Sequence, residues 1–212
     1  MSSIVSRSTL RVFPRNSLSG QLLINLRRMS KSALVILAPG AEEMEFVIAA
    51  DVLRRAEVKV TVAGLGSAGP IKCSRDVVAV PDVSLADVAG QEFDAVVLPG
   101  GLGGAKALSE SAEVGKVLKR HEESNKLIAA ICAGPTALVA HKIGVGKSIT
   151  SYPSVKDKVT EDYKYVDDKT CVQDGQLITS RGPGTAFEWA LKIAENLAGP
   201  EKTQAVKKGM LL

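Results

Sequence analysis

The feature that most constrains the fold of this chain is a series of short, unbroken apolar runs. They lie at 32–38, 59–64, 94–98 and 127–131. Apolar runs of this length without polar alternation are typical of strands buried on both faces, as in parallel sheets. Between the first two runs, residues 42–56 carry apolar side chains at helical spacing, and such a strand–helix–strand unit joins parallel strands by a right-handed crossover. We therefore expect an α/β fold with a mostly parallel central sheet.

The connections between these runs carry turn and capping signals. The pair Asp174-Gly175 predicts a two-residue turn between two strands. Thr185 and Glu188 predict a capping box that starts a helix ending near residue 197. We find no internal repeat and no second domain boundary, so residues 31–212 are expected to form a single domain. Further elements are expected as a hairpin at 71–80, helices at 112–123 and 135–141, a loosely patterned polar stretch at 147–168 and a short helix after 201.

The first 30 residues differ in composition from the rest of the chain. Up to residue 31 there are six basic residues and no acidic one, with serines and apolar residues between the arginines. This composition is typical of a mitochondrial targeting segment. Two alternatives stay open: a leader without a targeting function, and translation from Met29, which would give a cytosolic form. The predicted locations are the mitochondrion and the cytoplasm, with the nucleus as a further option.

The net charge of +4 comes from this leader. The remaining chain holds 21 basic and 23 acidic residues, and this balance gives no support to nucleic-acid binding. No apolar run approaches the length of a membrane span. The three cysteines are an odd count without metal-ligand spacing, which argues against a disulfide framework. The two histidines form no metal pair, and His121 is expected to be solvated among its charged neighbours. We expect neither a metal nor an organic cofactor.

Cys132 follows the run 127–131 directly and precedes Ala133-Gly134-Pro135. Because Pro135 suits the first turn of a helix, the thiol is expected at a sharp strand-to-helix turn, the geometry of a nucleophile elbow. The N–H groups and the positive end of the following helix would favour thiolate over thiol and could hold an oxyanion. The alternative is a small buried thiol that happens to end a strand.

Two other strand ends are expected near this cysteine, because sites in open α/β sheets form beyond the carboxyl ends of the strands. The first strand leads to Glu42, Glu43 and Glu45. These acids could simply complement the start of a helix. One of them could instead be held neutral by burial and donate a hydrogen bond to the sulfur, and the residues alone do not choose among them. The glycine-rich loop at 99–104 either supplies oxyanion donors or is an ordinary strand-to-helix turn.

Seven stretches of the chain, taken together, resemble the Parkinsonism-associated deglycase family within the ThiJ/PfpI superfamily. The likeness extends in order over about residues 30 to 208. It implies a flavodoxin-like three-layer sandwich and a homodimer. The stretches that carry the resemblance are ALVILA at 33–38, GAEEME at 40–45, VTVAGL at 60–65, CSRDVV at 73–78, VLPGG at 97–101, AAICAGPTAL at 129–138 and TSRGPGT at 179–185.

The resemblance also implies a reactive cysteine at Cys132, with Glu45 as its hydrogen-bonding carboxyl. The backbone at Gly101 and Ala133 would line the same site. The wider superfamily often has a histidine directly after the nucleophile, where this chain has Ala133. That difference argues against the hypothesis that the protein is a protease or an amidotransferase.

The resemblance assigns three further side chains to the surroundings of the site. Arg75 and Arg181 match family positions near the dimer-related pocket. Close relatives have a histidine near the site where this chain has Tyr152. A tyrosine at its ordinary pKa is a poor base at neutral pH, so any turnover is expected to be slow. Relatives also carry a cysteine where this chain has Val80, so no redox chemistry is expected at that position.

Three hypotheses about function follow from these observations. The first is a cofactor-free glyoxalase or deglycase, of hydrolase or lyase type, that acts on methylglyoxal-type 2-oxoaldehydes and their protein or nucleotide adducts. The second is a protein of the oxidative stress response, in which oxidation of Cys132 to sulfinate makes a redox sensor with chaperone-like behaviour. The missing histidine favours the second as the main role, although the two are compatible. The third is an interaction scaffold with an inert thiol.

Overall fold

A seven-stranded sheet lies at the centre of residues 30–212, which are the residues that the computed structural model describes. The strand order is β10-β11-β7-β6-β1-β2-β5. Neighbouring strands are parallel except β10 and β11 at one edge, so the expected mostly parallel sheet is confirmed. The strands are β1 (Ser32–Leu37), β2 (Lys59–Gly64), β5 (Val83–Ser84), β6 (Ala95–Leu98), β7 (Leu127–Ile131), β10 (Cys171–Asp174) and β11 (Leu177–Ser180).

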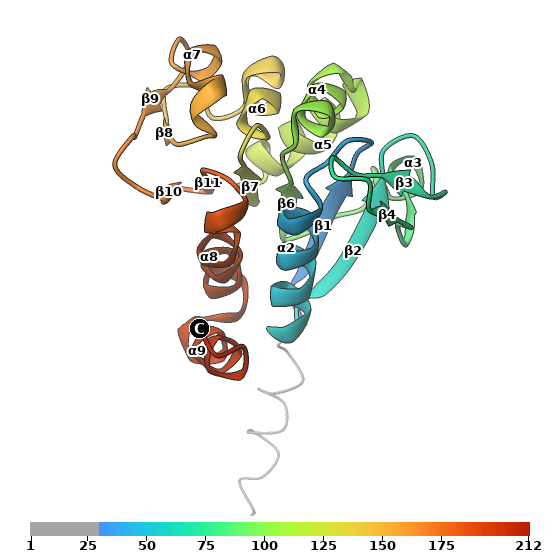
Figure 1. The fold of residues 1–212 in the computed structure, drawn as a ribbon, viewed down its shortest axis with the longest axis vertical. Coiled ribbons are helices and arrows are strands. Elements are labelled where there is room, and N and C mark those ends of the chain that lie inside the picture. Colours follow the sequence, from blue (N-terminus) through green and yellow to red (C-terminus); the bar gives the residue numbers. More distant parts are fainter. Residues whose placement is uncertain (1–29) are drawn as a thin grey trace, which may run out of the picture.

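Helices cover both faces of this sheet and complete a three-layer sandwich (Figure 1). Alternate residues of β1 enter two separate cores, because successive side chains of a strand point to opposite faces. Val35 packs in the core that includes the fully buried Trp189, whereas Leu34 packs in the core that includes Leu118. The first core lies under α2 (Glu43–Arg55) and α8 (Ala186–Ala198), and the second under α3 (Leu85–Val88), α4 (Leu102–Glu110), α5 (Ala112–Glu123) and α6 (Pro135–His141).

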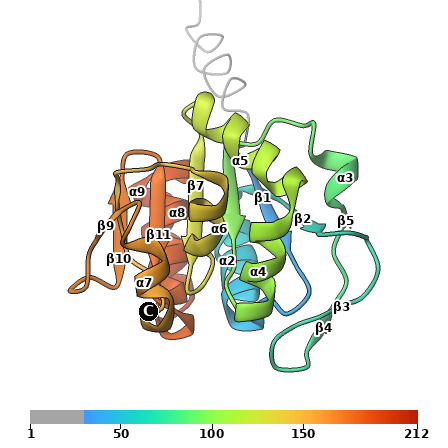
Figure 2. The ribbon, with the colours of Figure 1, turned by 90° about the horizontal axis from the view of Figure 1, so that it is seen from above.

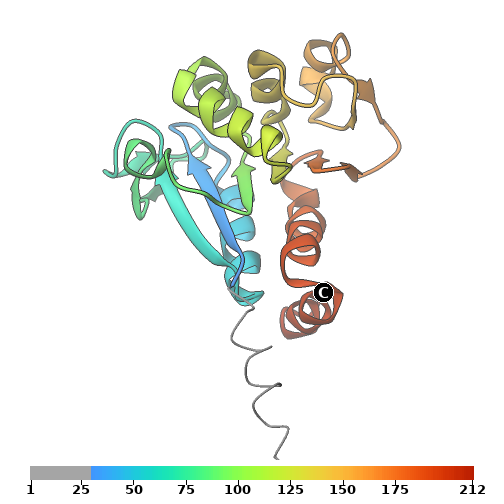
Figure 3. The ribbon, with the colours of Figure 1, turned by 180° about the vertical axis from the view of Figure 1, so that it is seen from behind.

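Smaller elements lie outside the sheet. Figure 2 shows the hairpin of β3 (Ile71–Lys72) and β4 (Val78–Ala79) standing away from the main layers, as expected for an excursion from the sheet. The tail forms α9 (Pro200–Gly209) beside the end of α8 (Figure 3). The polar stretch at 147–168 is more ordered than its sequence indicates. It contains β8 (Ser148–Ile149), a 3-10 turn (Pro153–Val155), α7 (Lys156–Val159) and β9 (Lys164–Tyr165).

Three local expectations are corrected by the structure. The glycine-rich loop ends at Gly101, because Gly103 and Gly104 lie inside α4, where a Cβ on Gly104 would come within 2.7 Å of the Ala41 Cα. The hairpin turn is shifted by one residue, because Asp174 already pairs with Leu177.

The capping box of Thr185 and Glu188 does not form. The Thr185 hydroxyl instead accepts a hydrogen bond from the N–H of Gly182 at 3.1 Å, and Glu188 accepts one from the Thr170 hydroxyl at 2.6 Å. A second turn (Pro183–Thr185) therefore competes for the hydroxyl that the capping box would need.

The strand order reverses between β1 and β6, since the chain moves outward from β1 to β2 and then returns to the other side of β1. In open α/β sheets, sites form beyond the carboxyl ends of the strands at such a reversal. The carboxyl ends of β1, β6 and β7 are neighbours there, which confirms the placement of these three strand ends at one edge. No helix within 30–212 is long and apolar enough to span a bilayer. The leader at 1–30 lies outside the described residues, apart from Ser30.

Candidate active site

Cys132 occupies the sharp turn between β7 and α6, as the sequence predicts. Its backbone has φ +63°, in the left-handed region that residues other than glycine rarely adopt. Two main-chain hydrogen bonds hold the turn: the N–H of Cys132 donates to the Ser180 carbonyl at 3.0 Å, and the Cys132 carbonyl accepts from the N–H of Tyr152 at 2.8 Å. An uncommon backbone conformation held from both sides is typical of functional positions.

Two glycines bring the end of β6 against this turn. A Cβ on Gly100 would lie 2.6 Å from the Cys132 Cβ, so the backbone reaches the cysteine only because that position has no side chain. Gly101 has φ +79°, and a Cβ there would lie 2.4 Å from the Gly40 carbonyl oxygen. The N–H groups of Gly101 and Ala133 both act to lower the pKa of the Cys132 thiol. The backbone of these two residues therefore lies beside the thiol, where the family resemblance places it.

Glu45 is the acid that reaches the thiol. It lies in the first turn of α2 and is fully buried. Its Oε2 accepts a hydrogen bond from the N–H of Gly100 at 2.7 Å, and the carboxyl is near enough to the Cys132 thiol for each group to shift the pKa of the other. Oε1 makes no well-aligned hydrogen bond within 30–212. Burial raises the pKa of Glu45 to about 7, although the hydrogen bonds from Gly100 and Cys132 act to lower it.

Burial and a neighbouring carboxyl oppose the thiolate that the sequence predicts at Cys132. Burial, followed by the nearby charge of Glu45, raises the pKa of Cys132 to about 12, against the lowering effect of the Gly101 and Ala133 N–H groups. The N–H groups of Gly134 and Thr136, at the start of α6, donate to backbone carbonyls and not to the sulfur. Burial and the Glu45 charge therefore oppose the thiolate that the sequence predicts, whereas two N–H groups act in its favour, as expected. The thiol and the carboxyl form a pair that carries one negative charge once its first proton has left.

The other two acids of this segment form a separate cluster. The Ser74 hydroxyl lies 2.8 Å from Glu42 Oε2 and 2.9 Å from Glu43 Oε2, and the N–H of Arg75 donates to Glu43 Oε1 at 2.7 Å. Burial acts to raise the pKa of Glu43, but hydrogen bonds from the backbone and from Ser74 lower it overall. This cluster ties the hairpin of β3 and β4 to the start of α2, so these acids do more than complement a helix dipole.

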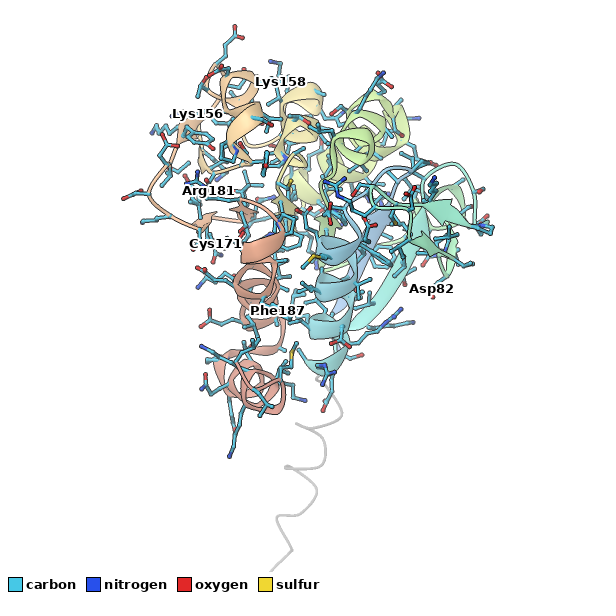
Figure 4. All side chains as sticks on the ribbon, in the orientation of Figure 1. Asp82, Lys156, Lys158, Cys171, Arg181 and Phe187 are labelled. Carbon is cyan, nitrogen blue, oxygen red and sulfur yellow. The ribbon has the colours of Figure 1, made fainter. Side chains whose placement is uncertain are left out.

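A pocket of about 420 Å³ opens over the cysteine. Cys132 is 9% exposed and lines its floor, whereas Arg75 and Tyr152 line its walls. Arg181 does not reach this pocket, because its guanidinium donates to the Asp167 carbonyl. Arg181 directly follows Ser180, which pairs with Cys171 between β11 and β10; Figure 4 labels Arg181 and Cys171. Sequence reasoning missed Ser74 and Leu102, which also line the pocket, since neither belongs to a chemical motif.

The histidines and the other cysteines lie away from this pocket. His121 is 2% exposed and its Nδ1 hydrogen-bonds the Val117 carbonyl at 2.8 Å, so the expectation of a solvated side chain is wrong. His141 hydrogen-bonds the Leu108 carbonyl. Cys73 is buried within the hairpin, next to Ser74, and does not line this pocket, whereas Cys171 lines a different cavity of about 720 Å³ beside α8 and α9. No group of three potential metal-ligating side chains occurs in the described part of the chain.

The fold and this site together define a class: an α/β sandwich with a cysteine at a strand-to-helix elbow and a buried carboxyl in contact with its sulfur. Residues 31–196 match the model of the DJ-1/PfpI family, and the chain belongs to that family. The resemblance found in the sequence is thereby confirmed.

Individual relatives are similar over most of their length. Protein dj-1beta of Drosophila melanogaster is 66% identical over 87% of this chain and 98% of that protein. The glutathione-independent glyoxalase DJR-1.2 of Caenorhabditis elegans is 50% identical over 86% of this chain and 97% of that protein. The crystal structure of Drosophila DJ-1beta superposes with a TM-score of 0.86 and covers 87% of this chain and 99% of that one.

Proposed function

We propose that this protein protects against oxidative and carbonyl stress by converting 2-oxoaldehydes into 2-hydroxy acids at Cys132, without an organic cofactor. The observation that carries the proposal is the contact between the Cys132 sulfur and the buried Glu45 carboxyl, next to two backbone N–H donors. The glyoxalase named among the relatives supports the same reaction class. Early adducts of these aldehydes with protein or nucleotide amines are a second substrate class for the same chemistry.

The first step forms a bond between the sulfur and the aldehyde carbon. Glu45 takes the thiol proton as the sulfur attacks, so that the pair does not need a standing thiolate. A pKa of about 7 suits a carboxylate that must accept a proton and return it at neutral pH. The aldehyde oxygen becomes an alkoxide, and the N–H groups of Gly101 and Ala133 are positioned to stabilise it. Glu45 then returns the thiol proton to this oxygen, so the product of this step is a hemithioacetal and Glu45 is a carboxylate again.

The second step moves hydrogen between the two carbons of the substrate. Glu45 removes the proton from the former aldehyde carbon and delivers it to the neighbouring carbon, while the hydroxyl proton of the hemithioacetal passes to the former ketone oxygen, which gives a thioester on Cys132. One carbon is oxidised and its neighbour is reduced, so no external oxidant or reductant is needed. Water then hydrolyses the thioester, which releases the 2-hydroxy acid and restores the thiol. The position of the histidine found in close relatives is taken by Tyr152, so Glu45 supplies both proton transfers.

The test is lactate formation from methylglyoxal without glutathione, with the wild-type chain and two variants. Cys132→Ala is expected to abolish lactate formation. Cys171→Ala is the matched control, because its thiol lines a different cavity, and it is expected to keep wild-type turnover. Full lactate formation by Cys132→Ala would refute the proposal.

A second candidate function is redox sensing by Cys132. The sulfur lines an open pocket and faces two N–H donors that would also stabilise a sulfinate. Its raised pKa favours the enzymatic role over this one, because peroxide reacts with the thiolate. The sensor role predicts that mild peroxide adds two oxygens to Cys132, as mapped by intact and peptide mass. Oxidation that falls mainly on Cys171 would reject it.

We further propose a homodimer in which α2 contributes to the interface. Met44 and Val47 on α2 are 52% and 51% exposed, which is unusual for large apolar side chains on a helix this well packed. Exposed valines of the neighbouring hairpin extend this surface, and the hairpin is tied to α2 by the hydrogen bond from the Ser74 N–H to the Ala41 carbonyl. Light scattering should give twice the chain mass for the wild type and a monomer for Val47→Arg. A monomeric wild type would refute the proposal.

The leader at 1–30 supports a further proposal about location. Its acid-free, arginine-rich composition would direct the chain to mitochondria, while a start at Met29 would leave a cytosolic form. A fluorescent fusion of the full chain is expected to co-localise with mitochondria, and a fusion that begins at Met29 is expected not to. Identical distributions of the two fusions would remove the targeting role.

A further inference from the structure

The lining of the pocket over Cys132 is chemically mixed. Glu42, Ser74 and Arg75 supply charged and polar groups, next to the hairpin. Leu102, Tyr152 and Pro183 supply apolar surface. Leu102 is 68% exposed and Tyr152 is 44% exposed, although both are large side chains with apolar surface. Apolar side chains that remain exposed at the mouth of a pocket are available to a ligand.

Tyr152 is fixed relative to the nucleophile. Its backbone N–H donates to the Cys132 carbonyl at 2.8 Å. On its other side the ring lies against Gly182, where a Cβ would be 3.4 Å from the ring Cδ2. The backbone of Leu102 is placed by α4, of which it is the first residue, directly after Gly101. The backbones of both residues are therefore set by elements that adjoin the site.

The pocket is also larger than a three-carbon aldehyde requires. Its volume of about 420 Å³ is of the size that encloses much larger ligands. When methylglyoxal is bound to the sulfur through its aldehyde carbon, its methyl group would leave the exposed surfaces of Leu102 and Tyr152 in water. A larger apolar substituent on the same dicarbonyl group would cover them.

We propose that Leu102, Tyr152 and Pro183 form an apolar subsite for the substituent of the 2-oxoaldehyde, so that aryl-substituted substrates are preferred over glyoxal and methylglyoxal. The turnover test of this inference rests on the proposed function. A second test is independent of the proposed function. The dicarbonyl end lies over Cys132 and the N–H donors, and the substituent lies between Tyr152 and Leu102. Tyr152 is then a specificity residue, which gives a role to the position where close relatives carry a histidine.

The turnover test compares kcat/KM for phenylglyoxal and glyoxal. The wild type is expected to prefer phenylglyoxal by about tenfold, since one apolar group in a pocket is worth about that much in discrimination. In the double variant Leu102→Ser with Tyr152→Ser the preference is expected to fall towards one, chiefly through a higher KM for phenylglyoxal. Phe187→Ser is the matched control, because this half-exposed ring lines the other cavity (Figure 4), and its ratio should equal the wild-type ratio. An unchanged ratio in the double variant would overturn the subsite.

The second test does not depend on turnover. Cys132 is alkylated with iodoacetamide and with its N-phenyl derivative, and the two rates are compared by peptide mass. The subsite predicts that the phenyl reagent gains several-fold over iodoacetamide in the wild type, relative to the double variant. Equal ratios in the two proteins would refute the subsite. If this preference is present while no 2-oxoaldehyde is turned over, the subsite stands and the proposed function fails.

Discussion

Replacing Glu45 by glutamine tests the central physical claim, that one carboxyl controls the ionisation of the sulfur. Glutamine keeps the shape of the side chain and can still accept the N–H of Gly100, which lies 2.7 Å from Glu45 Oε2. The substitution removes only the charge and the titrating proton. Its effect on Cys132 can therefore be worked out from the pKa values of the pair.

The magnitude follows from the Coulomb energy of the pair. Two unit charges about 4 Å apart interact by roughly 4 kcal/mol at an effective dielectric constant of about 20, which is about 3 pKa units. Without the Glu45 charge, the pKa of Cys132 falls from about 12 to about 9. In the wild type, Glu45 loses its proton first, with a pKa of about 7. The thiolate is then about 1% of the singly charged pair, because 9 and 7 differ by about two units.

The assay is the pH dependence of iodoacetamide labelling at Cys132, followed by peptide mass between pH 5 and pH 10. The wild-type rate is expected to level off above about pH 7, since the thiolate share of the pair no longer changes. The Glu45→Gln rate is expected to keep rising to about pH 9, where it exceeds the wild-type rate roughly 50-fold. Parallel profiles would show that Glu45 does not control the sulfur. A fast wild-type plateau below pH 6 would show that the sulfur itself holds the charge.

Three further predictions concern stability and backbone geometry. Burial acts to raise the pKa of Asp94, but the Ser32 N–H and two lysines lower it to about 2, so its contribution is present above about pH 4 and is lost as the pH falls through about 2. Asp94→Asn should unfold in urea with about 1–2 kcal/mol less stability at pH 7, and most of this deficit should be gone at pH 2. Burial lowers the pKa of His121, so the unfolded chain binds a proton at a higher pH than the folded chain does, and the free energy of unfolding decreases as the pH drops below about 6.5. His121→Gln should lessen that decrease in urea titrations. Gly101→Ala forces a Cβ within 2.4 Å of the Gly40 carbonyl oxygen at φ +79°, and thermal unfolding should show a loss of at least about 2 kcal/mol, whereas a neutral result would mean that this turn relaxes.

Much of the fold was predictable because it depends on local patterns. The four apolar runs became β1, β2, β6 and β7, and 112–123 became α5, because continuous burial and helical spacing leave few alternatives. The elbow was predictable for the same reason. A strand, two small residues and Pro135 fix the turn at Cys132.

The selection of Glu45 from three acids was left open by the residues, although a signal was present. Glu45, Ala49 and Val52 lie at positions i, i+4 and i+7 of α2, and all three are buried. His121 likewise falls in the apolar stripe of α5, with Val117 and Val114. In both helices the periodicity identifies the inward face more reliably than the polarity of a single side chain.

The charge of the sulfur was not predictable from sequence, because it depends on burial and on a neighbour 87 positions away in the chain. A pattern that places a thiol at a helix start predicts a lowered pKa. The folded molecule adds desolvation and a carboxylate, and each acts in the opposite direction. The elbow is therefore a local property, whereas the protonation state belongs to the assembled site.

The left-handed backbone at Cys132 limits how this chain can change. A residue with a Cβ at φ +63° costs roughly 1 kcal/mol more than glycine, which adopts that conformation without strain. A laboratory selection for heat resistance alone would therefore drift towards glycine at position 132 and discard the thiol. A cysteine at this position lowers the stability of the folded state, and only the function of its sulfur offsets that cost.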